Sequence, residues 1–175
     1  KPHSAPVVNI TKYTSSITDS IFREKFIRFA YRWKFTNGQY SAFSPFTEVV
    51  FDPIIGSGFD YNTQDGFNER MINNVKKIKL TLPTIEVDHV EEIDILYKES
   101  NNTNVYVYKT VAATTTSLTI DGSNSNFLKE SIYSVVPENQ LIRQYDNVPY
   151  RAKALDIVGN RLVFGNYTDG LNVSG

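Results

Sequence analysis

Hydrophobic and polar residues alternate with a period of two along much of the chain, most regularly between Phe26 and Phe46. Before Asn37, the odd positions of this stretch are apolar and mostly aromatic, whereas the even positions are largely basic or small. The odd set is Ile27, Phe29, Tyr31, Trp33 and Phe35, and the even set is Arg28, Ala30, Arg32, Lys34 and Thr36. Because successive side chains of a β-strand point to opposite faces, the pattern predicts a strand with an aromatic core face and a basic outer face.

The dipeptide Asn37-Gly38 follows this strand and predicts a two-residue type I′ hairpin. A two-residue turn sets the register of the returning strand, and it brings Phe43 next to Arg32, where a cation–π contact can form. The predicted neighbours on the aromatic face are Phe35 and Tyr40, Trp33 and Ala42, and Tyr31 and Ser44. We therefore expect the core to contain Phe29, Tyr31, Trp33, Phe35 and Tyr40.

Shorter alternating stretches predict further strands in residues 78–82, 93–97 and 105–111. A second hairpin is predicted around Gly159-Asn160. Its expected cross-strand neighbours are Ile157 and Leu162, and Leu155 and Phe164. Apolar residues at helical spacing predict two short helices, in residues 18–26 and 65–75. Together these elements predict an all-β sandwich with short helices.

The length of 175 residues is sufficient for one domain or two small ones. We expect an extended arm in residues 1–20, a β-sandwich in residues 21–122, and an extension with the second hairpin in residues 123–175. The chain starts at Lys1 and has no apolar stretch like that of a secretory signal, so we expect a piece of a longer protein. Its apolar runs are far shorter than the about 20 residues that a membrane-spanning helix needs.

The composition excludes several classes of protein. With 18 Lys and Arg against 19 Asp and Glu, the formal net charge is −1, which argues against a dedicated nucleic-acid binder. The chain has no cysteine, and this excludes disulfide scaffolds, zinc ribbons and thiol nucleophiles.

Residues for catalysis or metal binding are few. The only histidines are His3 and His89, and no second histidine lies near His89 to complete a metal site. Glu92 and Asp94 share the polar face of a predicted strand, where a solvated surface is favoured over a glycosidase-type carboxylate pair. Residues 60–71 resemble a calcium loop but lack its glycine and its final glutamate. We therefore expect no enzymatic activity, no cofactor and no metal.

The basic face of the first strand is the main candidate for a partner. Arg28, Arg32 and Lys34, with Phe43 beside them, fit three interpretations: solvated or intramolecular pairing, a protein interface, or a nucleic-acid platform. The last is disfavoured because the aromatic residues lie on the opposite face. A second candidate interface is residues 148–158, where Val148 precedes a proline that favours extended backbone. Its candidate contact residues are Pro149, Tyr150 and Arg151. We also expect the arm in residues 1–20 to contact partners.

Two segments carry a resemblance to known families. Residues 29–46, "FAYRWKFTNGQYSAFSPF", resemble the last two strands of a fibronectin type III unit, and residues 90–111 are similar to the central strands of another. Residues 26–53 and 136–173 also resemble virion structural proteins of tailed bacteriophages, specifically the nozzle or muzzle proteins of short-tailed and crAss-like phages. The resemblance implies an immunoglobulin- or fibronectin III-like antiparallel sandwich with extended terminal arms, and it brings no catalytic residues.

From this resemblance we expect a structural, non-enzymatic component of a phage tail that contacts copies of itself and neighbouring virion proteins in a ring or tube. The alternative is a fibronectin III-like binding module for a host-surface glycan or protein. Its binding loops would be residues 99–104 and 121–126, both rich in amides and hydroxyls.

Overall fold

The computed structural model describes residue 2 and residues 4–12, 20–23, 25–52, 73–85, 89–122, 134–142 and 151–168. Strands dominate these residues, and the one helix among them has a single turn. In chain order the elements are β1 (Val7–Lys12), β2 (Ile27–Phe35), β3 (Val75–Thr81), β4 (Val90–Glu99), β5 (Tyr106–Ala112), β6 (Ser117–Asp121), β7 (Ser134–Val135), α1 (Glu138–Leu141), β8 (Arg151–Val158) and β9 (Arg161–Thr168). No helix in the described ranges is long and apolar enough to cross a membrane.

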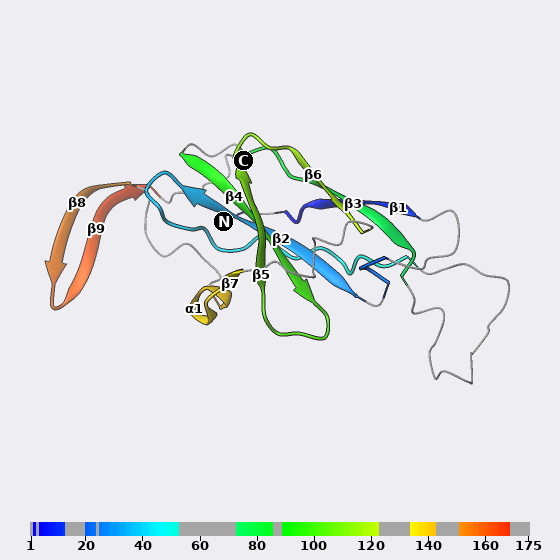
Figure 1. The fold of residues 1–175 in the computed structure, drawn as a ribbon. Helices are drawn as coiled ribbons and strands as arrows, with labels where there is room; N and C mark the ends of the chain where they lie inside the picture. Colours follow the sequence, from blue (N-terminus) through cyan, green and yellow to red (C-terminus); the bar gives the residue numbers. More distant parts are fainter. Residues whose placement is uncertain are drawn as a thin grey trace.

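Two antiparallel sheets form a sandwich, as the alternating pattern predicts (Figure 1). The first sheet has the order β1-β3-β6 and the second has the order β2-β4-β5-β7. The two segments that resemble parts of two separate fibronectin units lie in the same sheet, because β2 pairs with β4 along its length. The strand β1 lies within the segment expected to be an extended arm, and it forms one edge of the first sheet.

The main core lies between the two sheets. From β2 it contains Phe29 and Tyr31, which are almost completely buried, and Trp33, which is 7% exposed. These side chains meet a set of aliphatic residues from the other strands: Val75, Ile78, Leu80, Ile93, Ile95 and Ile120. The predicted core face of β2 is thus confirmed for these three aromatic residues, whereas Phe35 and Tyr40 are only half-buried.

A smaller apolar cluster lies on the outer face of the second sheet. Ala30 of β2 and Leu96 of β4 alternate with the core residues of their strands, so their side chains point away from the first sheet. Val136 covers them, and its amide donates to the carbonyl of Val105 at 2.9 Å. The segment with β7 and α1 therefore closes over this outer face.

The outer edge of β2 is paired by a segment that is not a strand. Ser41, Ser44 and Thr47 are buried, and their amides donate to the carbonyls of Trp33, Tyr31 and Phe29 at 2.8–2.9 Å. Each hydroxyl accepts the amide N–H of the same β2 residue at 2.9–3.0 Å and donates to the carbonyl of the residue that follows it in the chain. Each step of three residues along the segment thus covers the same distance as two residues of β2, about 6.7 Å.

This pairing corrects the predicted first hairpin. Tyr31 does lie opposite Ser44, but Lys34 rather than Phe35 bridges to Tyr40, and the amide of Ser41 bonds to Trp33. The amide of Phe35 donates to the carbonyl of Gln39, so the turn is longer than two residues.

The helix predicted in residues 18–26 is also wrong in its described part. Ser20–Arg23 form a turn that buries Phe22 against Gly122, where a methyl group would come within 2.6 Å of the Phe22 ring. Another helix was predicted in residues 65–75, and its residues 65–72 lie outside the described residues. Its last residue, Val75, begins β3.

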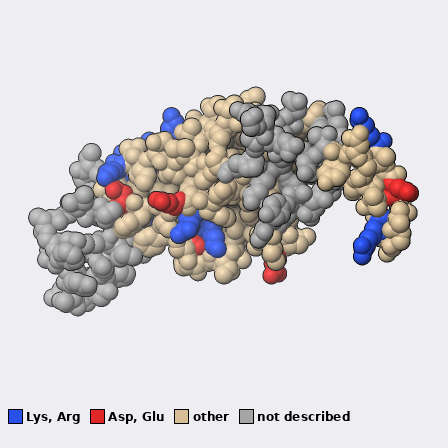
Figure 2. Space-filling view, turned by 180° about the vertical axis from the view of Figure 1, so that it is seen from behind, with Lys and Arg blue, Asp and Glu red and all other residues tan. Residues whose placement is uncertain are grey.

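The second predicted hairpin is confirmed with its register. Strands β8 and β9 pair so that Ile157 lies opposite Leu162 and Leu155 lies opposite Phe164. Gly159 and Asn160 both have positive φ, 54° and 63°, as a type I′ turn requires. The hairpin forms a separate two-stranded sheet and stands apart from the sandwich in Figure 1. In Figure 2 it is the thin projection at the right, with charged side chains of both signs along it.

Candidate interaction surfaces

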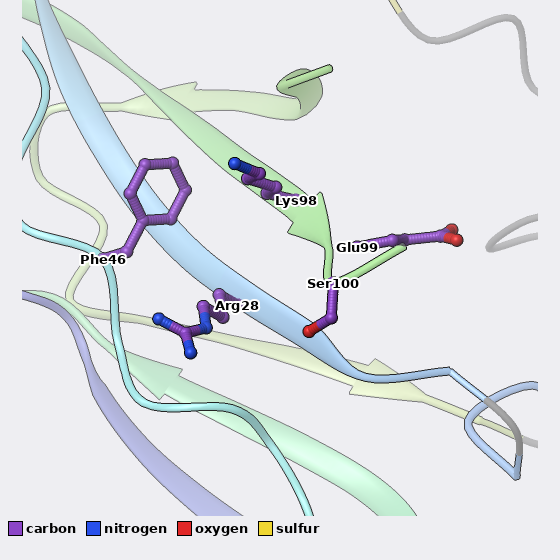
Figure 3. A pocket seen from close by; sticks show the side chains of 5 residues that line it. All are labelled: Arg28, Phe46, Lys98, Glu99 and Ser100. Atoms are coloured by element: carbon purple, nitrogen blue, oxygen red, sulfur yellow. The ribbon is translucent and has the colours of Figure 1, made fainter. Parts of the chain in front are cut away.

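Arg28 lies on the outer face of the second sheet, where the sequence places a candidate interface. Its side chain is exposed, and its cross-strand neighbour in β4 is another cation, Lys98. The two border a hollow of about 270 Å³ that Phe46, Glu99 and Ser100 also line. In Figure 3 Arg28 and Lys98 lie on the Phe46 side of the hollow, and Glu99 points away from it. Phe46 and Lys98 were not among the predicted residues. Lys98 reaches Arg28 through the pairing of β2 with β4, and Phe46 belongs to the segment that pairs with the other edge of β2.

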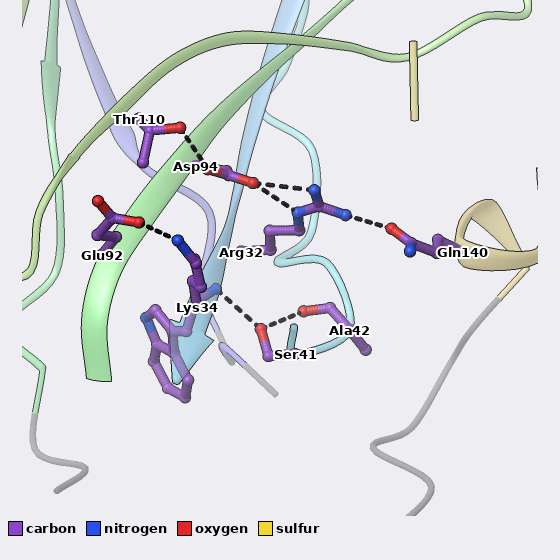
Figure 4. Close-up of polar contacts among 9 residues, drawn as sticks. Arg32, Lys34, Ser41, Ala42, Glu92, Asp94, Thr110 and Gln140 are labelled. Carbon is purple, nitrogen blue, oxygen red and sulfur yellow. Dashed lines mark hydrogen bonds and ion pairs between the residues drawn. The ribbon is translucent and has the colours of Figure 1, made fainter. Parts of the chain in front are cut away.

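Arg32 lies four residues further along β2 and is buried. Its Nε and Nη2 atoms both lie 2.9 Å from Oδ2 of Asp94, its cross-strand neighbour in β4 (Figure 4). Nη1 donates to the side-chain carbonyl of Gln140 in α1. Thr110 of β5 donates to the other oxygen of Asp94 at 2.6 Å. A buried charge pair is tolerated when its donors and acceptors are satisfied in this way, and we call these four residues the buried polar network.

The buried polar network of Arg32 matches one of the three interpretations of the basic face. The intramolecular pairing is the one that the structure shows, because only 7% of the Arg32 side chain is exposed. The aromatic ring beside the guanidinium is that of Tyr40, 3.9 Å from its centroid, whereas Phe43 packs half-buried against the smaller apolar cluster. The expectation of a solvated face for Asp94 is wrong, since that residue is 3% exposed.

Lys34 is also paired within the chain. Its ammonium group bonds to the carboxylate of Glu92, its cross-strand neighbour, and about a third of each side chain is exposed. This hydrogen bond, and next the negative charge of Glu92, raise the pKa of Lys34 above its usual value. Of the three predicted basic residues, Arg28 is therefore the one with an exposed side chain and no ion pair within the described part of the chain.

Large apolar side chains of the β8–β9 hairpin are exposed to water. Leu155, Ile157 and Leu162 are 63%, 72% and 52% exposed, and by the period of two they share one face with the half-buried Phe164. The exposed cation Lys153 lies on that face too, and the other face carries Val158, Val163 and Tyr167 together with Asp156 and Arg161. Arg151, a predicted contact residue, begins β8, whereas Pro149 and Tyr150 lie outside the described residues.

The loop proposed for glycan binding uses its amide within the chain. The Asn102 side chain donates to the Tyr106 hydroxyl at 3.0 Å and accepts the amide N–H of Asn104 at 3.0 Å. Residues 123–126 of the other loop fall outside the described ranges. Among the residues with described placement, no group of three or more His, Cys, Asp or Glu could hold a metal ion.

Comparison with known proteins adds no family to this picture: no family model, curated protein or solved structure matches the chain.

Proposed function

We propose that this chain is a structural, non-enzymatic subunit of a protein assembly, and that the β8–β9 hairpin is the arm by which it contacts neighbouring subunits. The observation that carries the proposal is the exposed apolar face with Leu155, Ile157 and Leu162. These residues lie on a two-stranded sheet that has no third strand among the described residues.

An isolated two-stranded hairpin is marginally stable in water, since it has neither enough strands nor a covered apolar face. Complete burial of a Leu or Ile side chain contributes about 1.5–3 kcal/mol relative to exposure. Covering the three residues with a partner therefore offsets the entropy lost when the ribbon is ordered. The open edges of both strands also leave backbone groups free to pair with another chain.

The sandwich supports the same proposal in a different way. The polar cluster around Arg32 and Asp94 is buried and satisfied within the chain, which suits a rigid body rather than a reaction centre. Together with the resemblance of residues 26–53 and 136–173 to phage nozzle and muzzle proteins, this leads us to propose a place in the virion tail. The proposed partners are copies of this chain and neighbouring virion proteins.

The test compares two sets of substitutions by sedimentation velocity and chemical cross-linking. We expect Leu155→Ser, Ile157→Ser and Leu162→Ser together to abolish association. The matched control is Ile142→Ser, which removes a side chain that is 73% exposed outside the hairpin, and we expect it to leave association unchanged.

Fluorescence of the single tryptophan, which lies in the core, checks that both variants keep the folded sandwich. A wild-type chain that remains monomeric in cross-linked virions as well as in solution would refute the proposal. Equal loss of association in the control would assign the contact to a surface other than the hairpin.

A further inference from the structure

The pairing of Arg28 with Lys98 is unfavourable for the isolated chain. The register of β2 and β4 places the two cations directly opposite each other. Directly opposed side chains of an antiparallel pair have their Cβ atoms only about 5 Å apart, and like charges there are destabilising. Beyond the apolar pair Ala30–Leu96, the two other charged pairs on the same face are complementary, Arg32 with Asp94 and Lys34 with Glu92. The Arg28–Lys98 pair therefore departs from the charge pattern of its own sheet.

The surroundings of this pair supply no balancing carboxylate among the described residues. Glu99 also lines the hollow, but its Oε1 atom lies 3.2 Å from the ammonium group of Lys25. Ser100 lines it too, and its hydroxyl donates to the carbonyl of Phe26 at 3.1 Å. Two positive charges thus face the same space, with an aromatic ring, Phe46, as its apolar wall.

We propose that this hollow, formed by Arg28, Lys98 and Phe46, binds a carboxylate group. A guanidinium presents a planar fork of donors that matches the two oxygens of a carboxylate, and an ammonium group adds a third donor. The ring of Phe46 contacts the carbon atoms that carry the acid. The volume of about 270 Å³ is at the small end for ligand pockets and suits a short acid or one acidic side chain.

This inference goes beyond the proposed function, because the hollow lies on the sandwich and the arm is the separate hairpin. The carboxylate has two possible sources, a free small acid or an Asp or Glu side chain on another protein. Two probes separate the sources: glutarate, and a blocked Gly-Glu-Gly tripeptide. A third probe, inorganic phosphate, has the charge but no carbon chain for Phe46.

The experiment records amide and Arg side-chain N–H resonances of the full chain during titration with each probe. We expect saturable shifts at the residues of the hollow with glutarate, with the tripeptide, or with both, and weaker binding of phosphate. The probe that binds more tightly identifies the source. Arg28→Gln and Lys98→Gln should each weaken binding about tenfold, as loss of one charge-assisted hydrogen bond implies. The matched control is Lys79→Gln, an exposed cation on β3, which should bind as wild type does.

Thermal unfolding is a second measurement. If Lys98 had only a structural role, its replacement would not change how much the ligand stabilises the chain. Without ligand, Lys98→Gln should unfold at the same temperature as wild type or higher, because it removes the repulsion. With the same concentration of glutarate or tripeptide, wild type should gain more stability than the variant, because it binds the ligand more tightly. The proposal is overturned if neither carboxylate probe shifts these residues, if phosphate binds as tightly as they do, or if Lys79→Gln weakens binding equally.

Discussion

Removal of the Asp94 carboxylate tests how strongly the buried polar network depends on charge balance. In Asp94→Ala the guanidinium of Arg32, 7% exposed, loses the acceptor for two of its nitrogen atoms and keeps Gln140 as its acceptor among the described residues. Breaking a buried pair by removing one partner costs about 3–5 kcal/mol, because the remaining charge stays desolvated. The free energy of unfolding of a domain is only about 5–15 kcal/mol, so this cost is a large part of it. With a urea dependence of about 2 kcal/mol per M, the unfolding midpoint should fall by about 2 M.

The assay is urea unfolding followed by fluorescence of the single tryptophan, Trp33. Glu92→Ala is the matched control: it removes a carboxylate from the same strand face, but its partner Lys34 is about a third exposed, so the cost should stay below about 1 kcal/mol. Replacing both partners, with Arg32→Met and Asp94→Leu, should return the stability to within about 1 kcal/mol of wild type or above it. Equal costs for Asp94→Ala and Glu92→Ala would refute the reasoning, since Arg32 would then be effectively solvated.

Three further predictions concern the sandwich. Ser44→Ala should lower the free energy of unfolding by about 1–3 kcal/mol because the amide of Tyr31 loses its acceptor, whereas Ser117→Ala, at an exposed site, should change it by less than about 0.5 kcal/mol in urea titrations. Burial raises the pKa of Tyr31 to about 12, whereas a hydrogen bond with Ser4 acts in the opposite direction. Its folded-state pKa is thus above its unfolded value of about 10, so its contribution to stability is complete below pH 10 and about 2 kcal/mol is lost as the pH rises to 12. A Tyr31→Phe variant that loses stability equally over that range would contradict this. Gly122→Ala should cost about 1–3 kcal/mol in thermal or urea unfolding, because the new methyl group meets the buried ring of Phe22; an unchanged midpoint would show that the ring can move.

The two hairpins show which parts of the fold can be predicted from local sequence. Around Gly159-Asn160 both turn residues adopt positive φ, so the two-residue turn alone determines the register, and Leu155 lies where the sequence predicts. After Asn37-Gly38 the returning segment contains Pro45, which has no amide N–H for a ladder, and hydroxyl residues that compete for the backbone groups of β2. Their bonds depend on tertiary pairing, which alternation of apolar residues does not reveal.

The candidate site residues also differ in whether local sequence predicts their surroundings. Arg28 could be predicted as exposed because it occupies the polar face of an alternating strand. Arg32 occupies the same face, but α1, more than a hundred residues later in the chain, covers it: Gln140 is 108 residues from Arg32. Neither this cover nor the meeting of Arg28 with Lys98 follows from local pattern, since both require the register between distant strands.

The segment from Ser41 to Thr47, whose hydroxyl groups pair with the backbone of β2, limits how the length of this protein can vary. Ser41, Ser44 and Thr47 meet β2 at every third residue, whereas β2 offers the backbone groups of its outer edge at every second residue. Inserting or deleting one residue between Ser41 and Thr47 would therefore leave an apolar or a proline residue where a hydroxyl is needed. A change of three residues, by contrast, would keep the hydroxyls in phase and shift the segment by one repeat. We expect natural variants of this chain to differ in length here by three residues or not at all.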